Sequence, residues 1–229
     1  GAFLAKLDAN YNVLWFTQLT GASAGAGIGD KFVHDKLSGA NYVIGQRGVD
    51  ELVIQDSVIT SSVGPYNYFI AKLSASGSFL WIEEFPAQIS LDDLTILADG
   101  VLLSGVYPAG SLIVNGETLI NQGSNDCFVI KYDPDGIKAF VRTVGGSDIE
   151  YLCITDADQE GNIYLASEAT SQGVTMEDGF QFPLEEGDGN VLVVKYDGNG
   201  TRIWQDSYSG SSTTDYSSWP TAPTVDPFG

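Results

Sequence analysis

The stretch that decides the fold is Phe128-Val-Ile-Lys-Tyr-Asp-Pro-Asp-Gly-Ile-Lys-Ala-Phe140. It opens with three consecutive apolar residues, which is typical of a strand that is buried on both faces. Asp133-Pro-Asp-Gly136 follows, and Asx and Gly residues supply the left-handed backbone of a tight hairpin turn. A large aromatic, Phe140, stands nine residues after Lys131. The stretch therefore predicts a strand, a turn and a second strand.

Three other stretches of the chain repeat this pattern. They begin Phe3-Leu-Ala-Lys-Leu-Asp, Phe69-Ile-Ala-Lys-Leu-Ser and Leu192-Val-Val-Lys-Tyr-Asp. Their lysines, together with Lys131, are Lys6, Lys72 and Lys195, so the pattern returns every 59 to 66 residues. The aromatic nine residues later is Trp15, Trp81 and Trp204. Recurrence of one pattern at a nearly constant spacing is the signature of a repeat protein.

The remainder of each repeat also aligns. Two further apolar segments, separated by a turn, precede the lysine: 31–36 and 42–45, then 94–97 and 101–105, then 151–155 and 163–166. An insertion such as Ser111-Leu-Ile-Val-Asn-Gly-Glu-Thr-Leu-Ile120 predicts an additional β-ribbon. Each repeat is thus expected to hold four strands in two hairpins, and no helical periodicity is present.

Four antiparallel strands at a fixed period predict an all-β fold, a β-propeller with one four-stranded blade for each repeat. A β-solenoid is the alternative, and it is disfavoured because its coils are usually shorter and lack paired hairpin turns. We expect three full repeats, 30–86, 87–146 and 147–210, flanked by partial repeats at 1–29 and 211–229. Propellers have about four to eight blades, so we expect the chain to be an incomplete propeller within a longer polypeptide.

The repeat resembles a known family. The pattern Phe/Leu-x-x-Lys-Tyr/Leu-Asp-x-x-Gly-x-x-x-Trp, followed by a Gly-rich turn and x-x-Asp-x-x-Gly-Asn-x-Tyr, is similar to the SBBP family of bacterial β-propeller repeats over essentially the whole chain. The first two copies depart from it at Tyr11 and Ser74. The resemblance implies a large secreted or cell-surface bacterial protein, often type IX secretion cargo and often with adhesive domains. The family offers no catalytic residues to carry over.

Composition limits the partners. The chain has 10 Lys and Arg residues against 30 Asp and Glu residues, a net charge of −20. Such a surface repels nucleic acid and anionic lipid headgroups, and no apolar run is long enough to cross a bilayer. We therefore expect no nucleic-acid partner and no membrane insertion.

One segment has the spacing of a metal loop. Asp156, Asp158 and Glu160, followed by Gly161, match the first half of an EF-hand-like loop, in which alternate acids wrap oxygens around Ca²⁺. Position 12 of such a loop needs a bidentate Glu, and Ser167 stands there. The same residues also suit an Asx-rich hairpin turn without metal, and that reading is favoured.

Other candidate groups are better explained by architecture. We expect the repeated lysines to lay their stems along the sheet and reach an acid or a carbonyl, and the aromatic series to pack between sheets. Cys127 and Cys153 lie in strands of different repeats, which predicts two buried free thiols. His34 is the only histidine, which leaves a Ser-His-Asp triad or a zinc site poorly supplied.

The sequence therefore predicts a non-catalytic extracellular module that acts as an interaction, adhesion or spacing scaffold. Its partner would be a protein, a glycan or another domain of the same polypeptide. Two alternatives stay open: a carbohydrate-binding lectin that uses exposed aromatics, and a propeller hydrolase or lyase with a carboxylate site.

Overall fold

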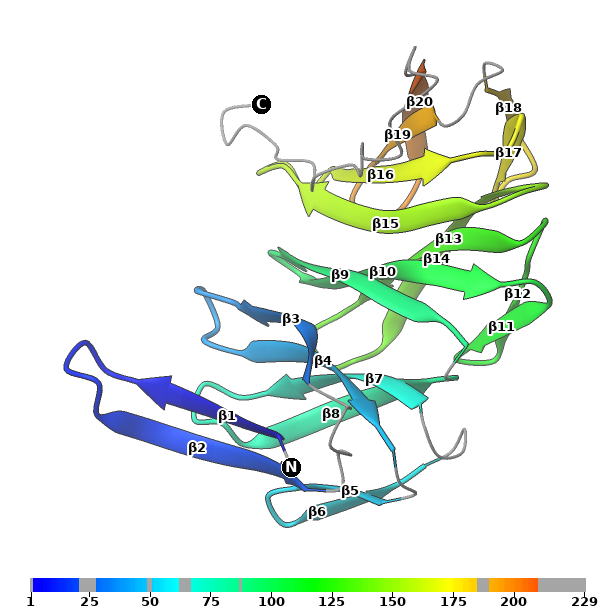
Figure 1. The fold of residues 1–229 in the computed structure, drawn as a ribbon. Coiled ribbons are helices and arrows are strands. Elements are labelled where there is room, and N and C mark those ends of the chain that lie inside the picture. Colours follow the sequence, from blue (N-terminus) through cyan, green and yellow to red (C-terminus); the bar gives the residue numbers. More distant parts are fainter. Residues whose placement is uncertain are drawn as a thin grey trace. The chain divides into compact units, whose positions relative to one another are not determined.

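The structure is a computed structural model that describes residues 2–20, 28–48, 51–61, 67–86, 88–184 and 190–209 (Figure 1). These residues form strands and turns, and none of them is helical, so none lies in a helix that could span a membrane. The prediction of an all-β fold is confirmed. The chain divides into two compact units, Gly1–Ile89 and Ser90–Gly229, which are described separately.

The first unit contains two four-stranded antiparallel sheets. The first sheet has the order β1-β2-β5-β6, with β1 (Ala2–Leu7), β2 (Val13–Thr20), β5 (Glu51–Ile54) and β6 (Ser57–Thr60). The second sheet has the order β3-β4-β7-β8, with β3 (Ile28–His34), β4 (Asn41–Arg47), β7 (Asn67–Leu73) and β8 (Phe79–Phe85).

The second unit contains two larger sheets and a separate ribbon. The third sheet has the order β18-β17-β14-β13-β10-β9, with β9 (Ser90–Leu97), β10 (Gly100–Pro108), β13 (Asn125–Tyr132), β14 (Lys138–Gly146), β17 (Gly173–Met176) and β18 (Gln181–Pro183). The fourth has the order β15-β16-β19-β20, with β15 (Glu150–Ala157), β16 (Ile163–Ala169), β19 (Asn190–Tyr196) and β20 (Arg202–Ser209). The insertion forms the predicted ribbon, β11 (Ser111–Val114) and β12 (Glu117–Ile120).

The four hairpins that carry the lysines share one register. Each lysine lies directly opposite the aromatic nine residues later, as Lys131 does opposite Phe140, and the register shifts immediately after the lysine in every copy. Their turns also agree: Gly136 donates its amide to the carbonyl of Asp133, and Gly77 donates to Ser74 in the same way. The repeat read from the sequence is therefore a repeat of structure.

Two of the ribbons do not join the sheet of their own repeat. β5 and β6 belong by sequence to the second repeat, yet β5 pairs with β2 of the first sheet. β17 and β18 belong to the fourth repeat, yet β17 pairs with β14 of the third sheet. Each ribbon also turns two buried apolar side chains inward, Leu52 and Ile54 in one case and Val174 and Met176 in the other. The ribbon thus ties consecutive repeats together.

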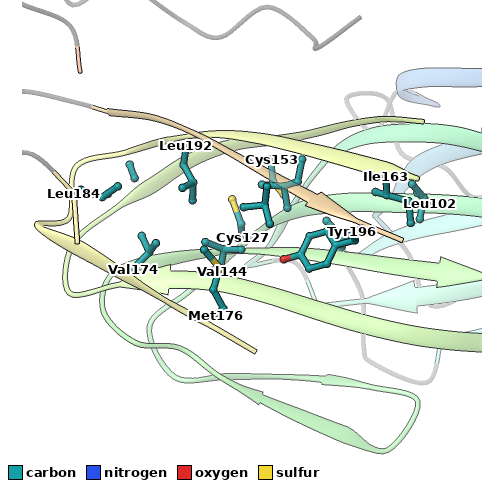
Figure 2. Packing of buried hydrophobic residues seen from close by; sticks show 14 of the residues in the cluster. Leu102, Cys127, Val144, Cys153, Ile163, Val174, Met176, Leu184, Leu192 and Tyr196 are labelled. Atoms are coloured by element: carbon teal, nitrogen blue, oxygen red, sulfur yellow. The ribbon is translucent and has the colours of Figure 1, made fainter. Parts of the chain in front are cut away.

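Buried apolar side chains fill the space between sheets within each unit. In the first unit Leu19, Leu52 and Ile54 of the first sheet pack with Phe69 and Ala71 of the second. In the second unit the third and fourth sheets meet in a cluster that includes Cys127, Val144, Leu192 and Tyr196 (Figure 2). Both cysteines lie in this cluster as buried free thiols, as predicted.

The division between the two units at Ile89 lies three residues beyond the predicted end of the second repeat at residue 86. Strand β3 begins at Ile28, earlier than the predicted segment 31–36. The predicted partial repeat at 211–229 lies outside the described residues.

Candidate functional site: the faces between repeat sheets

Within the first unit, an aromatic of one sheet closes over a hairpin turn of the next. The Trp15 Nε1 atom donates to the carbonyl oxygen of Ala75 at 3.0 Å, and the Thr17 hydroxyl donates to that of Gly77 at 2.7 Å. A Cβ atom at Gly77 would come within 2.6 Å of the Trp15 ring. The Trp15 indole can therefore lie over this turn only because residue 77 is a glycine.

The same contact recurs in the second unit at equivalent positions. Phe140 and Arg142 of the third sheet face the turn at Gly200 of the fourth, and the Arg142 Nε atom donates to the Gly200 carbonyl at 2.5 Å. A Cβ at Gly200 would lie 3.0 Å from Phe140. Phe140 and Trp15 occupy one repeat position, and Arg142 and Thr17 another. The prediction that this aromatic series packs between sheets is confirmed at both seams.

The repeated lysines also serve the architecture. Lys131 is buried and its Nζ atom lies 2.8 Å from both the Asp99 carboxylate and the Gly198 carbonyl. Lys195 donates to the Tyr164 hydroxyl at 2.6 Å and lies over the Tyr164 ring. Lys131 thus reaches an acid and a carbonyl, as the sequence predicts, and the Lys195 ammonium also lies 3.6 Å from the Asp158 carboxylate.

The calcium-loop residues span the end of β15 and the hairpin turn that follows it. Asp158 accepts the Asn162 amide nitrogen at 2.8 Å with one carboxylate oxygen and the Asn162 side chain at 2.8 Å with the other. These bonds lower the pKa of Asp158 against the opposing effect of burial, and the same turn occurs at Asp8. The Asp156 carboxylate accepts a hydrogen bond from the Ala157 backbone amide at 2.8 Å, and Glu160 lies in the turn. No group of three or more metal-ligating side chains occurs in the part of the chain that the structure describes.

Two buried carboxyl groups were not anticipated from the sequence. Asp126 accepts the Gln122 amide at 2.6 Å, and Glu150 accepts the Gly146 amide at 2.8 Å and the Ser171 hydroxyl at 2.6 Å. Burial raises the pKa of Asp126 to about 6 and that of Glu150 to about 7. The repeat itself carried a signal, because Asn67 and Asn190 occupy the position of Asp126 and are also buried.

His34 has a local structural role. Its Nδ1 atom lies 2.8 Å from the Asn41 side-chain oxygen, across the hairpin that joins β3 to β4. No nucleophile contacts it among the bonds found in the described residues.

The outer face of the first sheet is an exposed apolar surface. Phe3 and Phe16 stack there with ring centroids 5.3 Å apart, and Phe3 is 60% exposed. By strand alternation Ala5, Leu7 and Leu14 share this face, and β1 and β2 place no charged side chain on it. The equivalents of Phe3 in later repeats, Phe69, Phe128 and Leu192, are at most 1% exposed.

The outer face of the fourth sheet is also open. Trp204 is 40% exposed and Tyr208 is 59% exposed, and both lie on the face that carries Val191 and Val193. Trp15 and Phe140 hold the repeat position of Trp204, and each covers a hairpin of the other sheet in its unit. These two outer faces are the candidate functional surfaces of the chain, and sequence reasoning missed them because the pattern of each repeat is the same whether or not a neighbour covers it.

Comparison with models of known protein families and with curated protein sequences finds no match to this chain.

Proposed function

We propose that the chain is a non-catalytic scaffold of stacked repeat sheets, the blades of a β-propeller in a large secreted or cell-surface bacterial protein. The single observation that supports this most is the seam repeated at Gly77 and Gly200. There the residues that recur through the sequence hold one sheet on the next. The exposed apolar face of the first sheet, and the exposed Trp204 and Tyr208 on the fourth, suit contact with other folded surfaces.

Catalysis is disfavoured by the burial of the acids. A hydrolase or lyase needs carboxyl groups that reach a substrate, and the two with the most strongly raised pKa among the described acids, Asp126 and Glu150, are enclosed by the protein. Asp126 contacts the Gln122 amide and the Tyr107 hydroxyl, and Glu150 contacts the Gly146 amide and the Ser171 hydroxyl, so groups of the protein itself occupy both carboxylates. We therefore infer a binding or spacing role in place of an enzymatic one.

A lectin remains the second candidate because of one observation, the exposure of Trp204 and Tyr208 on a single face of β20. Aromatic faces in this arrangement can stack on sugar rings. The candidate is weaker than the scaffold, because the equivalents of Trp204 at the internal seams contact protein.

A glycan array with the purified chain, with and without Ca²⁺, separates these functions. The scaffold predicts no glycan signal in either condition. A signal lost on Trp204→Ala would favour the lectin and contradict the proposal. In the bacterium that makes the protein, protease treatment of intact cells should remove it, and full protection from protease would contradict a surface or secreted location.

A further inference from the structure

We propose that Tyr11 and Asp206 prevent the fourth sheet of one copy of this chain from docking on the outer face of the first sheet of another copy. We infer that this face binds instead a sheet of the same repeat type. That sheet has a small residue at the repeat position of Trp15 and Trp204, and a hydrogen-bond donor two residues later. The inference rests on the proposed function, because it takes the stacking of repeat sheets as the means of contact.

The outer face of the first sheet is one half of a seam. Phe3, Ala5 and Leu7 occupy the positions of Phe69, Ala71 and Leu73, which are buried against the first sheet in the core of the first unit. In the second unit Leu192, Val194 and Tyr196 occupy the same positions and are buried against the third sheet. The repeat thus assigns this face to the preceding sheet of a stack.

The outer face of the fourth sheet is the other half. Val191, Val193 and Trp204 occupy the positions of Ala2, Leu4 and Trp15 in the first sheet, which pack on or hydrogen-bond to the second. In the third sheet Cys127, Val129 and Phe140 occupy them and pack on the fourth. The first sheet therefore carries one half of a seam on its outer face, and the fourth sheet carries the other half.

The first mismatch between them is Tyr11. It occupies the turn position of Gly77 and Gly200 and adopts the same left-handed backbone, with φ of 64°. At Gly77 a Cβ atom alone would come within 2.6 Å of the tryptophan above it. Tyr11 adds a whole side chain there, which is 84% exposed, so Trp204 cannot take the place that Trp15 takes over Gly77.

The second mismatch is Asp206. Thr17 and Arg142 occupy its position, and each donates a hydrogen bond to the carbonyl of the turn glycine opposite. A carboxylate has no proton to donate and is repelled by a carbonyl oxygen. Asp206 would therefore face the Tyr11 carbonyl without a bond, and the buried oxygen would be left unsatisfied.

The partner follows from these two differences. The Tyr11 ring takes up room that an aromatic of the preceding sheet occupies at the internal seams, so that sheet needs a small residue at this position. A Thr or Arg two residues later restores the bond to the turn carbonyl. All four repeats of this chain carry an aromatic at the first position, which excludes them as partners in their natural form.

A binding experiment with the chain itself tests this. The wild-type chain is immobilised, and the soluble analyte is Phe3→Asp/Trp204→Ala/Asp206→Thr, in which the fourth sheet has the proposed partner chemistry. The matched control analyte carries Phe3→Asp alone. Phe3→Asp prevents analytes from binding one another and changes an exposed side chain, and circular dichroism checks that each variant is folded.

We expect the triple variant to bind the immobilised wild type at least about tenfold more tightly than the control analyte does. Immobilised Phe3→Asp chain should bind neither analyte. Immobilised Tyr11→Gly chain should in turn bind Phe3→Asp/Asp206→Thr, in which Trp204 is kept. Equal binding of both analytes to wild type, no binding by either, or undiminished binding to the Phe3→Asp chain would each overturn the proposal.

The stability of Gly77→Ala separates this inference from the proposed function. If Gly77→Ala lowers the free energy of unfolding by no more than the backbone strain alone, the sheets do not stack through the aromatic seam. The proposed function then fails. If Gly77→Ala is destabilising while the two analytes bind alike, stacking stands and only the roles of Tyr11 and Asp206 are wrong.

Discussion

The seam between the first two sheets predicts a graded series of glycine substitutions. Gly77, Gly161 and Gly200 all have left-handed backbones, with φ of 80°, 80° and 78°. A Cβ at Gly161 would meet nothing within 4 Å, one at Gly200 would lie 3.0 Å from Phe140, and one at Gly77 would lie 2.6 Å from Trp15. The three sites therefore share a backbone cost and differ in crowding.

The expected magnitudes follow from that difference. Placing alanine in a left-handed conformation costs about 1–2 kcal/mol of unfolding free energy at each site. Crowding in a well-packed seam adds about 1–3 kcal/mol, in full at Gly77 and in part at Gly200. We expect Gly161→Ala to lose about 1–2 kcal/mol and Gly77→Ala about 2–5 kcal/mol, with Gly200→Ala between them.

Urea unfolding followed by circular dichroism and tryptophan fluorescence measures the three losses. A double-mutant cycle with Trp15→Ala isolates the contact, because Gly77→Ala should cost less once the indole is gone. Equal losses at Gly77 and Gly161, or a cost at Gly77 that is unchanged without Trp15, would refute the seam as the structure has it.

Three other properties should follow. Because the pKa values of Asp126 and Glu150 are raised to about 6 and about 7, the folded chain holds more protons than the unfolded chain at mildly acidic pH. Unfolding free energy should therefore fall as pH rises through this range, and Asp126→Asn/Glu150→Gln should flatten the profile; an unchanged slope would contradict the assignment. Cys127 and Cys153 should resist a thiol reagent until the second unit unfolds, since burial raises the pKa of the Cys153 thiol, and labelling in the native state at the rate of a free thiol would count against their burial. Lys131→Met should cost about 1–2 kcal/mol in urea unfolding, because the Gly198 carbonyl loses its donor, and no loss would show that the lysine is dispensable.

The hairpins were accessible from the sequence because their determinants are local. Apolar runs, an Asx-Gly turn and the lysine-to-aromatic spacing define strand length and register together, and Lys131 does lie opposite Phe140. Burial of Cys127 and Cys153 followed from the same pattern. The turn glycines were explained only by their backbone angle, however, and their second role beneath an aromatic ring depends on a sheet some 60 residues away.

Edge pairing could not be predicted. The ribbons that begin with β5 and β17 alternate buried and exposed residues as any hairpin does, and this pattern does not indicate which sheet edge they join. Likewise Phe3 and Phe69 are identical in the pattern, yet one is exposed and the other is buried. Pairing and burial of this kind are set by neighbours in space, and a one-dimensional repeat does not contain them.

The placement of β5–β6 and β17–β18 on the sheet before their own has a consequence for how such a chain could lengthen or shorten during evolution. A duplication that runs from one lysine hairpin to the next would copy a ribbon without the sheet edge that the ribbon pairs with. It would also leave the edge strand of another sheet without its ribbon. A deletion would do the reverse. Recombination points that preserve the fold therefore do not coincide with the repeat boundaries in the sequence. A segment that is gained or lost must include the last strand of one repeat together with the ribbon of the next repeat.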